Sequence, residues 1–173
     1  MHNRVFECHD DLVQAARSHT TRSERGVFVG TGSAADDPLF EPVVEWIMEV
    51  ASGEIAPHAR LQSLWTWSAD QYSNPPHIHP NVSWAAIYCL EPGDPQGDDP
   101  LNGHTVLYSP LRSNYWDPGV DHLRTQSHWS ARLNRGDLLL FPGYLQHSAH
   151  YSGTEPRTII AMNIEWLPVA PRP

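Results

Sequence analysis

The sequence predicts an α+β fold that is mainly β, in which N-terminal helices support a jelly-roll or barrel core. Segments with helical hydrophobic spacing occur in the first 60 residues, whereas the chain after Arg60 reads as short strands rich in β-branched and aromatic residues. The 16 prolines and 11 glycines favour turns and loops over long helices. Helices followed by a series of strands indicate sheets that close over one another and protect their edges.

Two helices are expected ahead of the strands. The first spans residues 10–19, with Asp10 as its N-terminal cap. The second spans residues 38–50, with Pro42 in its first turn and Gly53 just past its end. Residues 26–37 between them read as a strand followed by a loop. The apolar positions of the two helices are Leu12, Val13, Ala15, Ala16, Val43, Val44, Trp46, Ile47 and Val50.

The remainder of the chain is expected to form strands and loops within one domain. The domain spans residues 1–173, with 1–60 as helical support and 61–168 as the jelly-roll core. Loop 91–103 is acidic, and loop 110–134 carries several aromatic residues of the kind that line a site. The strand candidates are residues 61–72, 84–90, 104–109, 137–141, 146–151 and 158–166, and the loop aromatics are Tyr115, Trp116 and Trp129.

The charge balance excludes some classes of partner. Twenty acidic residues against 11 arginines give a net charge of −9, which argues against nucleic acid or an anionic membrane surface. No run of 18 apolar residues is present, so no membrane span is expected. Cys8 and Cys89 lie in dissimilar surroundings and form no disulfide framework. We therefore expect a cytoplasmic protein with a small-molecule substrate, and the sequence allows a homo-oligomer.

The most informative segment is Asn74-Pro75-Pro76-His77-Ile78-His79-Pro80. In an extended strand alternate side chains share a face, so His77 and His79 can grip one metal ion. The flanking prolines stiffen the backbone and lower the entropy lost in positioning these ligands. His147, expected at the mouth of the barrel, supplies a third imidazole. Imidazole suits iron, zinc, copper and nickel, so histidines alone leave the metal open.

Arg157 opens the last predicted strand and is a candidate anion ligand. A guanidinium clamps a carboxylate with two parallel hydrogen bonds, so an arginine facing the barrel interior beside a metal would anchor an anionic co-substrate. The plain alternative is a surface charge at a strand end. Tyr72 and Asn163 also fall on strands that can face the cavity, although core packing explains either almost as well.

These motifs resemble the family of 2-oxoglutarate- and Fe(II)-dependent oxygenases over residues 67–163. The resemblance implies a double-stranded β-helix in which His77 and His147 bind iron and Arg157 holds the distal carboxylate of 2-oxoglutarate. It also implies that O2 and 2-oxoglutarate are consumed to give succinate and CO2 while a substrate is oxidised. The residues that carry it are Tyr72, Asn74, His77-Ile78-His79-Pro80-Asn81, Trp84-Ala85-Ala86-Ile87-Tyr88, Gly136-Asp137-Leu138-Leu139-Leu140-Phe141-Pro142, His147, Arg157 and Ala161-Met162-Asn163.

One position departs from the family pattern. Most such enzymes carry a carboxylate two residues after the first histidine, where this chain has His79. Three imidazoles would leave the metal its full positive charge, which strengthens attraction for an anionic co-substrate. We assign His77, His79 and His147 to the metal, and Arg157, Tyr72 and Asn163 to the co-substrate. A carboxylate from a loop, namely Asp98, Asp99 or Asp117, remains an alternative ligand.

Three functions compete at this point. The first is an Fe(II)- and 2-oxoglutarate-dependent oxygenase that hydroxylates or otherwise oxidises a small molecule or a side chain. The second is a three-histidine, cupin-like metal dioxygenase or isomerase that does not use 2-oxoglutarate. The third is a jelly-roll binding module with a structural zinc, although neither cysteine is placed to complete such a site.

Overall fold

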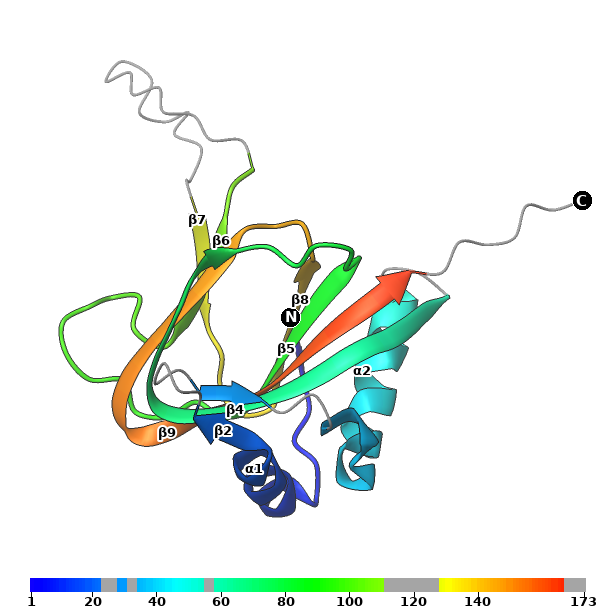
Figure 1. The fold of residues 1–173 in the computed structure, drawn as a ribbon, viewed down its shortest axis with the longest axis horizontal. Coiled ribbons are helices and arrows are strands. Elements are labelled where there is room, and N and C mark those ends of the chain that lie inside the picture. Colours follow the sequence, from blue (N-terminus) through cyan, green and yellow to red (C-terminus); the bar gives the residue numbers. More distant parts are fainter. Residues whose placement is uncertain (23–27, 31–33, 55–57, 111–127, 167–173) are drawn as a thin grey trace, which may run out of the picture.

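The structure, a computed structural model, describes residues 1–22, 28–30, 34–54, 58–110 and 128–166. It confirms the predicted α+β, mainly β class (Figure 1). Two short 3-10 turns, Ala34–Asp36 and Pro38–Phe40, precede the second helix. The helices are α1 (His9–Ser18) and α2 (Glu41–Glu54), and the strands are β1 (His2–Asn3), β2 (Thr20–Arg22), β3 (Phe28–Gly30), β4 (Ala59–His77), β5 (Trp84–Glu91), β6 (His104–Tyr108), β7 (His128–Arg132), β8 (Asp137–Pro142) and β9 (His147–Trp166).

One curled antiparallel sheet forms the core. Its strands run in the order β1-β8-β5-β9-β6-β7, and β4 pairs with β9 outside that path. The two longest strands, β4 and β9, are paired from Ala59 opposite Trp166 to His77 opposite His147. The C-terminal half of β9 pairs with β5, and its N-terminal end pairs with β6. Both strands therefore curl from one wall of the jelly roll into the other, as Figure 1 shows.

The strands are longer than the sequence predicts. Residues 146–151 and 158–166, predicted as separate strands, lie in the single 20-residue strand β9. The polar stretch between them, residues 153–156, has no partner in β4, because Ala69 pairs with Arg157 and Gln71 with Ser152. The Asp94 carboxylate holds this stretch instead by accepting hydrogen bonds from the backbone N–H groups of Thr154 and Glu155, at 2.9 and 2.6 Å. The 19-residue β4 bends instead of ending, with a register shift between Ala69 and Gln71. Strand β7 was also missed, inside the predicted loop 110–134.

Both helices form, with different ends from those predicted. Helix α1 starts at His9, and its N-cap is Cys8 without a side-chain hydrogen bond, so the predicted Asp10 cap is wrong. Asp10 lies in the first turn instead, where a negative charge favours the positive end of the helix dipole. Helix α2 continues through Gly53 to Glu54, so Gly53 does not end it.

Side-chain alternation gives the main wall of the sheet two different faces. Ile160, Met162 and Ile164 of β9 pack with the buried faces of α1 and α2 in the largest core cluster. The intervening residues, from Arg157 to Asn163, line a cavity on the opposite face. The helices therefore cover the convex side, and the concave side is left for a functional site.

Several smaller expectations can be checked within the described ranges. Cys8 and Cys89 are both free, as predicted. No described helix combines the length and apolar character needed to cross a membrane. Trp129 lies in β7 with 45 % of its surface exposed and does not line the cavity, so its predicted place in a site-lining loop is wrong. Tyr115, Trp116 and Asp117 lie outside the described residues.

The thiol of Cys89 should resist modification in the native protein. Burial raises the pKa of Cys89 to about 12, and only the thiolate is reactive. With Ellman's reagent at about pH 8, we expect the half-buried Cys8 to react first and Cys89 to react only on unfolding. The variant Cys8→Ser should lose the fast phase and Cys89→Ser should keep it. A fast phase in Cys8→Ser would contradict the buried position of Cys89.

Candidate metal centre

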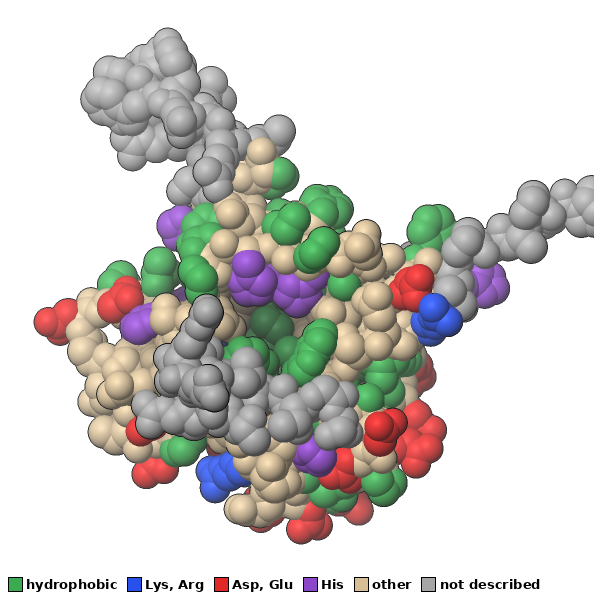
Figure 2. Space-filling view, viewed as in Figure 1, with side chains coloured by type: hydrophobic (Ala, Val, Ile, Leu, Met, Phe, Trp, Pro, Cys, Tyr) green, Lys and Arg blue, Asp and Glu red, His purple; other side chains and the backbone are tan. Residues whose placement is uncertain are grey.

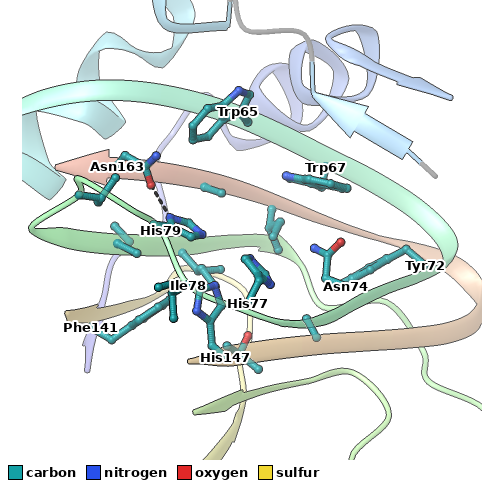
Figure 3. Close-up of a pocket in the computed structure, with 18 of the residues that line it drawn as sticks. Trp65, Trp67, Tyr72, Asn74, His77, Ile78, His79, Phe141, His147 and Asn163 are labelled. Atoms are coloured by element: carbon teal, nitrogen blue, oxygen red, sulfur yellow. Dashed lines mark hydrogen bonds between the residues drawn. The ribbon is translucent and has the colours of Figure 1, made fainter. Parts of the chain in front are cut away.

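Three histidines converge where β4 ends and β9 begins. His77 is the last residue of β4 and is the pairing partner of His147, the first residue of β9. His79 follows two residues after the strand end. One ring nitrogen from each of the three lies within 4.8 Å of the others, and Figure 3 shows the rings gathered in one pocket. The structure thus brings together all three histidines that the sequence singled out.

The position of His79 has a different cause from the one predicted. Strand alternation cannot place it, because β4 stops at His77. It lies in residues 78–82, which contain a turn at 80–81 and which we call the histidine turn. Its backbone N–H donates to the Gly143 carbonyl, just past the end of β8, at 2.9 Å. A side chain at Gly143 would collide with the Val82 backbone, so glycine permits this close approach of the β8 end to the histidine turn.

The Nδ1 atom of each ring faces a carbonyl oxygen. His77 pairs with the Pro75 carbonyl at 2.8 Å, His147 with the Leu145 carbonyl at 3.0 Å, and His79 with the side-chain oxygen of Asn163 at 2.6 Å. A carbonyl oxygen only accepts, so Nδ1–H is the donor and the lone pair of each neutral ring lies on Nε2. Metal-binding histidines commonly have such a partner, which sets the tautomer and ring orientation.

Burial keeps two of these imidazoles neutral near neutral pH. It lowers the pKa of His147 to about 4, against the opposing effect of the Leu145 carbonyl. Burial also lowers the pKa of His79, and the hydrogen bond to Asn163 opposes that shift. A metal binds the neutral form of imidazole, so these rings need not lose a proton first.

Among the described residues, no carboxylate belongs to the histidine group. Asp98 and Asp99 are exposed in the loop between β5 and β6, and Asp99 accepts a hydrogen bond from the Leu101 backbone. The described part of the chain therefore offers three imidazoles at this point and no acid. Asp117, the remaining alternative, is outside the described residues.

Arg157 is a buried cation without a counter-charge in the described part of the chain. Only 1 % of its surface is exposed, so the alternative of a surface charge is wrong. Its Nη1 donates to the Tyr72 hydroxyl, whereas Nε and Nη2 have no hydrogen-bond partner. A buried charge with unsatisfied donors is costly, and an anionic ligand is the usual compensation.

One cavity of about 370 Å³ contains both the histidines and Arg157. Tyr72 and Asn163 line it, as the sequence suggested, and contact Arg157 and His79 respectively. Sequence reasoning missed Thr105, whose buried hydroxyl has no hydrogen-bond partner in the described structure. Only its alternating place in β6 hinted at this position. Further lining residues are Trp65, Trp67, Asn74, Ile78, Pro80, Val82, Ala85, Ala86, Ile87, Phe141, Ala149, Ile159 and Ala161.

Several solved structures share the fold. The epimerase SnoN from nogalamycin biosynthesis, described as non-heme and alpha-ketoglutarate-dependent, is 16 % identical with a TM-score of 0.61, covering 95 % of this chain and 78 % of SnoN. HygX from Streptomyces hygroscopicus, solved with nickel and 2-oxoglutarate, is 13 % identical with a TM-score of 0.59, covering 93 % and 78 %. The non-heme monooxygenase ThoJ, solved with nickel, is 14 % identical with a TM-score of 0.56, covering 95 % and 71 %.

The sequence also matches one family model. The model is described as "Putative 2OG-Fe(II) oxygenase" and matches residues 63–163, more than half of the chain. No curated protein gives a significant match. The matched range includes the three histidines, Arg157 and most of the curled sheet. The chain therefore belongs to the 2-oxoglutarate- and Fe(II)-dependent oxygenases, enzymes that use Fe(II) as cofactor and 2-oxoglutarate and O2 as co-substrates.

Proposed function

We propose that this enzyme oxidises a small organic substrate by hydroxylation, with Fe(II) held by His77, His79 and His147 and 2-oxoglutarate held by Arg157. The observation that carries the proposal is a buried guanidinium, with Nε and Nη2 unpaired among the described residues, in the same cavity as three imidazoles whose Nε2 lone pairs are available. The three imidazoles suit Fe(II) and the guanidinium suits 2-oxoglutarate, the two groups that the family uses.

The three imidazoles suit the metal. Imidazole nitrogen is a good ligand for Fe(II), and His77, His79 and His147 would hold the ion. When bound, Fe(II) supplies the oxidation, in which one atom of O2 enters succinate, the other enters the hydroxylated product, and CO2 is released. Three neutral ligands leave the centre its full charge, which attracts the dianion 2-oxoglutarate.

The other part of the cavity suits a carboxylate. Nε and Nη2 of Arg157 are unpaired donors on one edge of the guanidinium, the edge that grips both oxygens of a carboxylate. The Tyr72 hydroxyl accepts from Nη1, so its own proton is available for the same anion. The Thr105 hydroxyl is a further buried donor on the cavity wall. The protein's part is to hold the co-substrate and exclude water.

No observation favours the competing functions. A three-histidine enzyme that does not use 2-oxoglutarate would leave Arg157 buried without an anion. A structural zinc site is normally closed by a fourth ligand, often cysteine. Within the described residues neither Cys8 nor Cys89 belongs to the histidine group, so a fourth position stays open.

Anaerobic titration of the Fe(II) protein with 2-oxoglutarate tests the proposal. We expect the metal-to-ligand charge-transfer band to develop in the wild type. The variant Arg157→Met should still bind Fe(II) but need at least ~30-fold more 2-oxoglutarate, because a buried carboxylate loses its paired charge. Arg135→Met is the matched control, since Arg135 is 52 % exposed and bonds to Glu91. Absence of the band in the wild type would refute the proposal.

Arg157→Met should weaken 2-oxoglutarate binding but stabilise the ligand-free protein. Without ligands, we expect Arg157→Met to raise the free energy of unfolding by about 1–3 kcal/mol, because it removes a buried charge with unsatisfied donors. Urea unfolding measures this, and Arg135→Met should change stability by no more than about 1 kcal/mol. Added 2-oxoglutarate should stabilise the metal-loaded wild type and not Arg157→Met. A marked loss of stability in Arg157→Met would show that the guanidinium has a structural partner.

The hydrogen bond from His79 to Asn163 can be tested by metal affinity. Asn163→Leu removes the acceptor for Nδ1–H, and we expect the dissociation constant for Fe(II) to rise by about 10–100-fold. Asn163→Asp keeps an acceptor and adds a negative charge, so affinity should be retained or increased. Anaerobic competition with a chelating dye measures both. Wild-type affinity in Asn163→Leu would mean that His79 is not held as a ligand by this bond.

A further inference from the structure

Few polar groups of the cavity wall remain unassigned once the metal and co-substrate are placed. The proposed function occupies the three imidazoles, Arg157, Tyr72 and Thr105, and the oxygen of Asn163 is bonded to His79. The Asn74 amide is the remaining polar side chain on the described lining. All other side chains that line the cavity are aliphatic or aromatic. These apolar groups are available to contact the substrate that is oxidised.

Two tryptophans form one side of this remaining wall. Trp65 and Trp67 are alternate residues of β4, so both project to the concave face, while Thr66 between them points to the opposite face. Figure 3 shows both indoles along β4, on the side of the pocket that faces His79 and His77. Both are half-buried, which leaves indole surface accessible in the cavity. Indole faces favour planar partners that stack or meet edge to face.

The histidine turn adds an apolar edge. Ile78 is 50 % exposed and lies between two of the candidate ligands, and Pro80 and Val82 line the same side of the cavity. Figure 2 shows histidine side chains next to hydrophobic ones around a hollow in this face of the molecule. Ile78 therefore offers accessible apolar surface beside the candidate metal ligands.

The charges of the wall limit the substrate further. No aspartate or glutamate lines the cavity among the described residues. The two carboxylates of 2-oxoglutarate offset two of the three positive charges on the metal and Arg157. A cationic substrate would therefore meet one remaining positive charge, and an anionic one would compete with 2-oxoglutarate for Arg157. The volume of about 370 Å³ must also hold the co-substrate, so only part of a larger substrate can enter.

We propose that the substrate is an uncharged organic molecule that inserts a planar, apolar ring against Trp65 and Trp67, with the remainder of the molecule over Ile78. This inference rests on the proposed function, since it assigns what the metal and co-substrate leave free. It names a class of substrate, neutral and ring-bearing, and excludes amines and acids at the inserted end.

Binding to the Ni(II)- and 2-oxoglutarate-loaded protein tests the inference without turnover. The probes are 2-naphthylmethanol, its cationic counterpart 2-naphthylmethylammonium, and the saturated decahydro-2-naphthylmethanol, titrated by calorimetry. We expect the cation to bind at least ~10-fold more weakly than 2-naphthylmethanol, because like charges repel in the cavity. The saturated probe should bind about threefold to tenfold more weakly, the usual worth of an aromatic pair.

Matched variants locate the ring. Trp65→Leu and Trp67→Leu should each weaken 2-naphthylmethanol about threefold to tenfold and leave the 2-oxoglutarate titration unchanged. Trp166→Leu, at an exposed tryptophan outside the cavity lining, should change neither. Failure of the wild type to bind 2-oxoglutarate would refute the proposed function itself. If 2-oxoglutarate binds normally, three results would overturn the substrate class alone. They are no binding of 2-naphthylmethanol, tighter binding of the cation, or unchanged 2-naphthylmethanol binding in Trp65→Leu and Trp67→Leu.

Discussion

The pairing of β4 with β9 is the constraint on which the whole site depends. Although the register shifts between Ala69 and Gln71 and again between Asn74 and His77, the pairing places His77 opposite His147 at one end and Ala69 opposite Arg157 further along. The bend after Ala69 then carries Tyr72 to the Arg157 guanidinium. One ladder of backbone hydrogen bonds therefore sets the places of two candidate metal ligands and of the candidate anion anchor. The position of His79 depends instead on the histidine turn and on the hydrogen bond to Asn163, so a substitution at Asn163 is expected to disturb it.

Because side chains alternate along β9, one face of the strand stabilises the fold and the other lines the candidate site. The residues of β9 that face the helices, such as Ile160 and Met162, are apolar and fully buried, and they provide the core that keeps the sheet curled. The opposite residues, Arg157 and Asn163, place polar groups where packing alone would favour apolar ones. A buried guanidinium with two nitrogen atoms unpaired among the described residues costs stability in the absence of ligand. Such a cost at a cavity wall is typical of a binding site, where the ligand completes the hydrogen bonds.

His79 connects the end of β4 to β9 through a side-chain hydrogen bond. It lies on the turn that leaves β4, and its ring donates to Asn163 on the far half of β9. The other two histidines donate to backbone carbonyls within their own segments. Among the three candidate ligands, His79 is therefore the one whose hydrogen-bond partner is a side chain. A neutral amide in that place leaves the three-imidazole group without negative charge.

The sequence by itself determined the fold class and identified the three histidines and Arg157 as candidate site residues, because hydrophobic alternation and short motifs are local properties. It could not determine that β9 is one strand, since the Asp94 contacts that hold the bulged residues 153–156 come from a distant loop. It also could not assign Asn163 to His79, reveal the Thr105 hydroxyl or set Trp65 and Trp67 beside the candidate metal ligands. Only the tertiary structure decided these, because each requires two segments far apart in the chain to meet across the curled sheet.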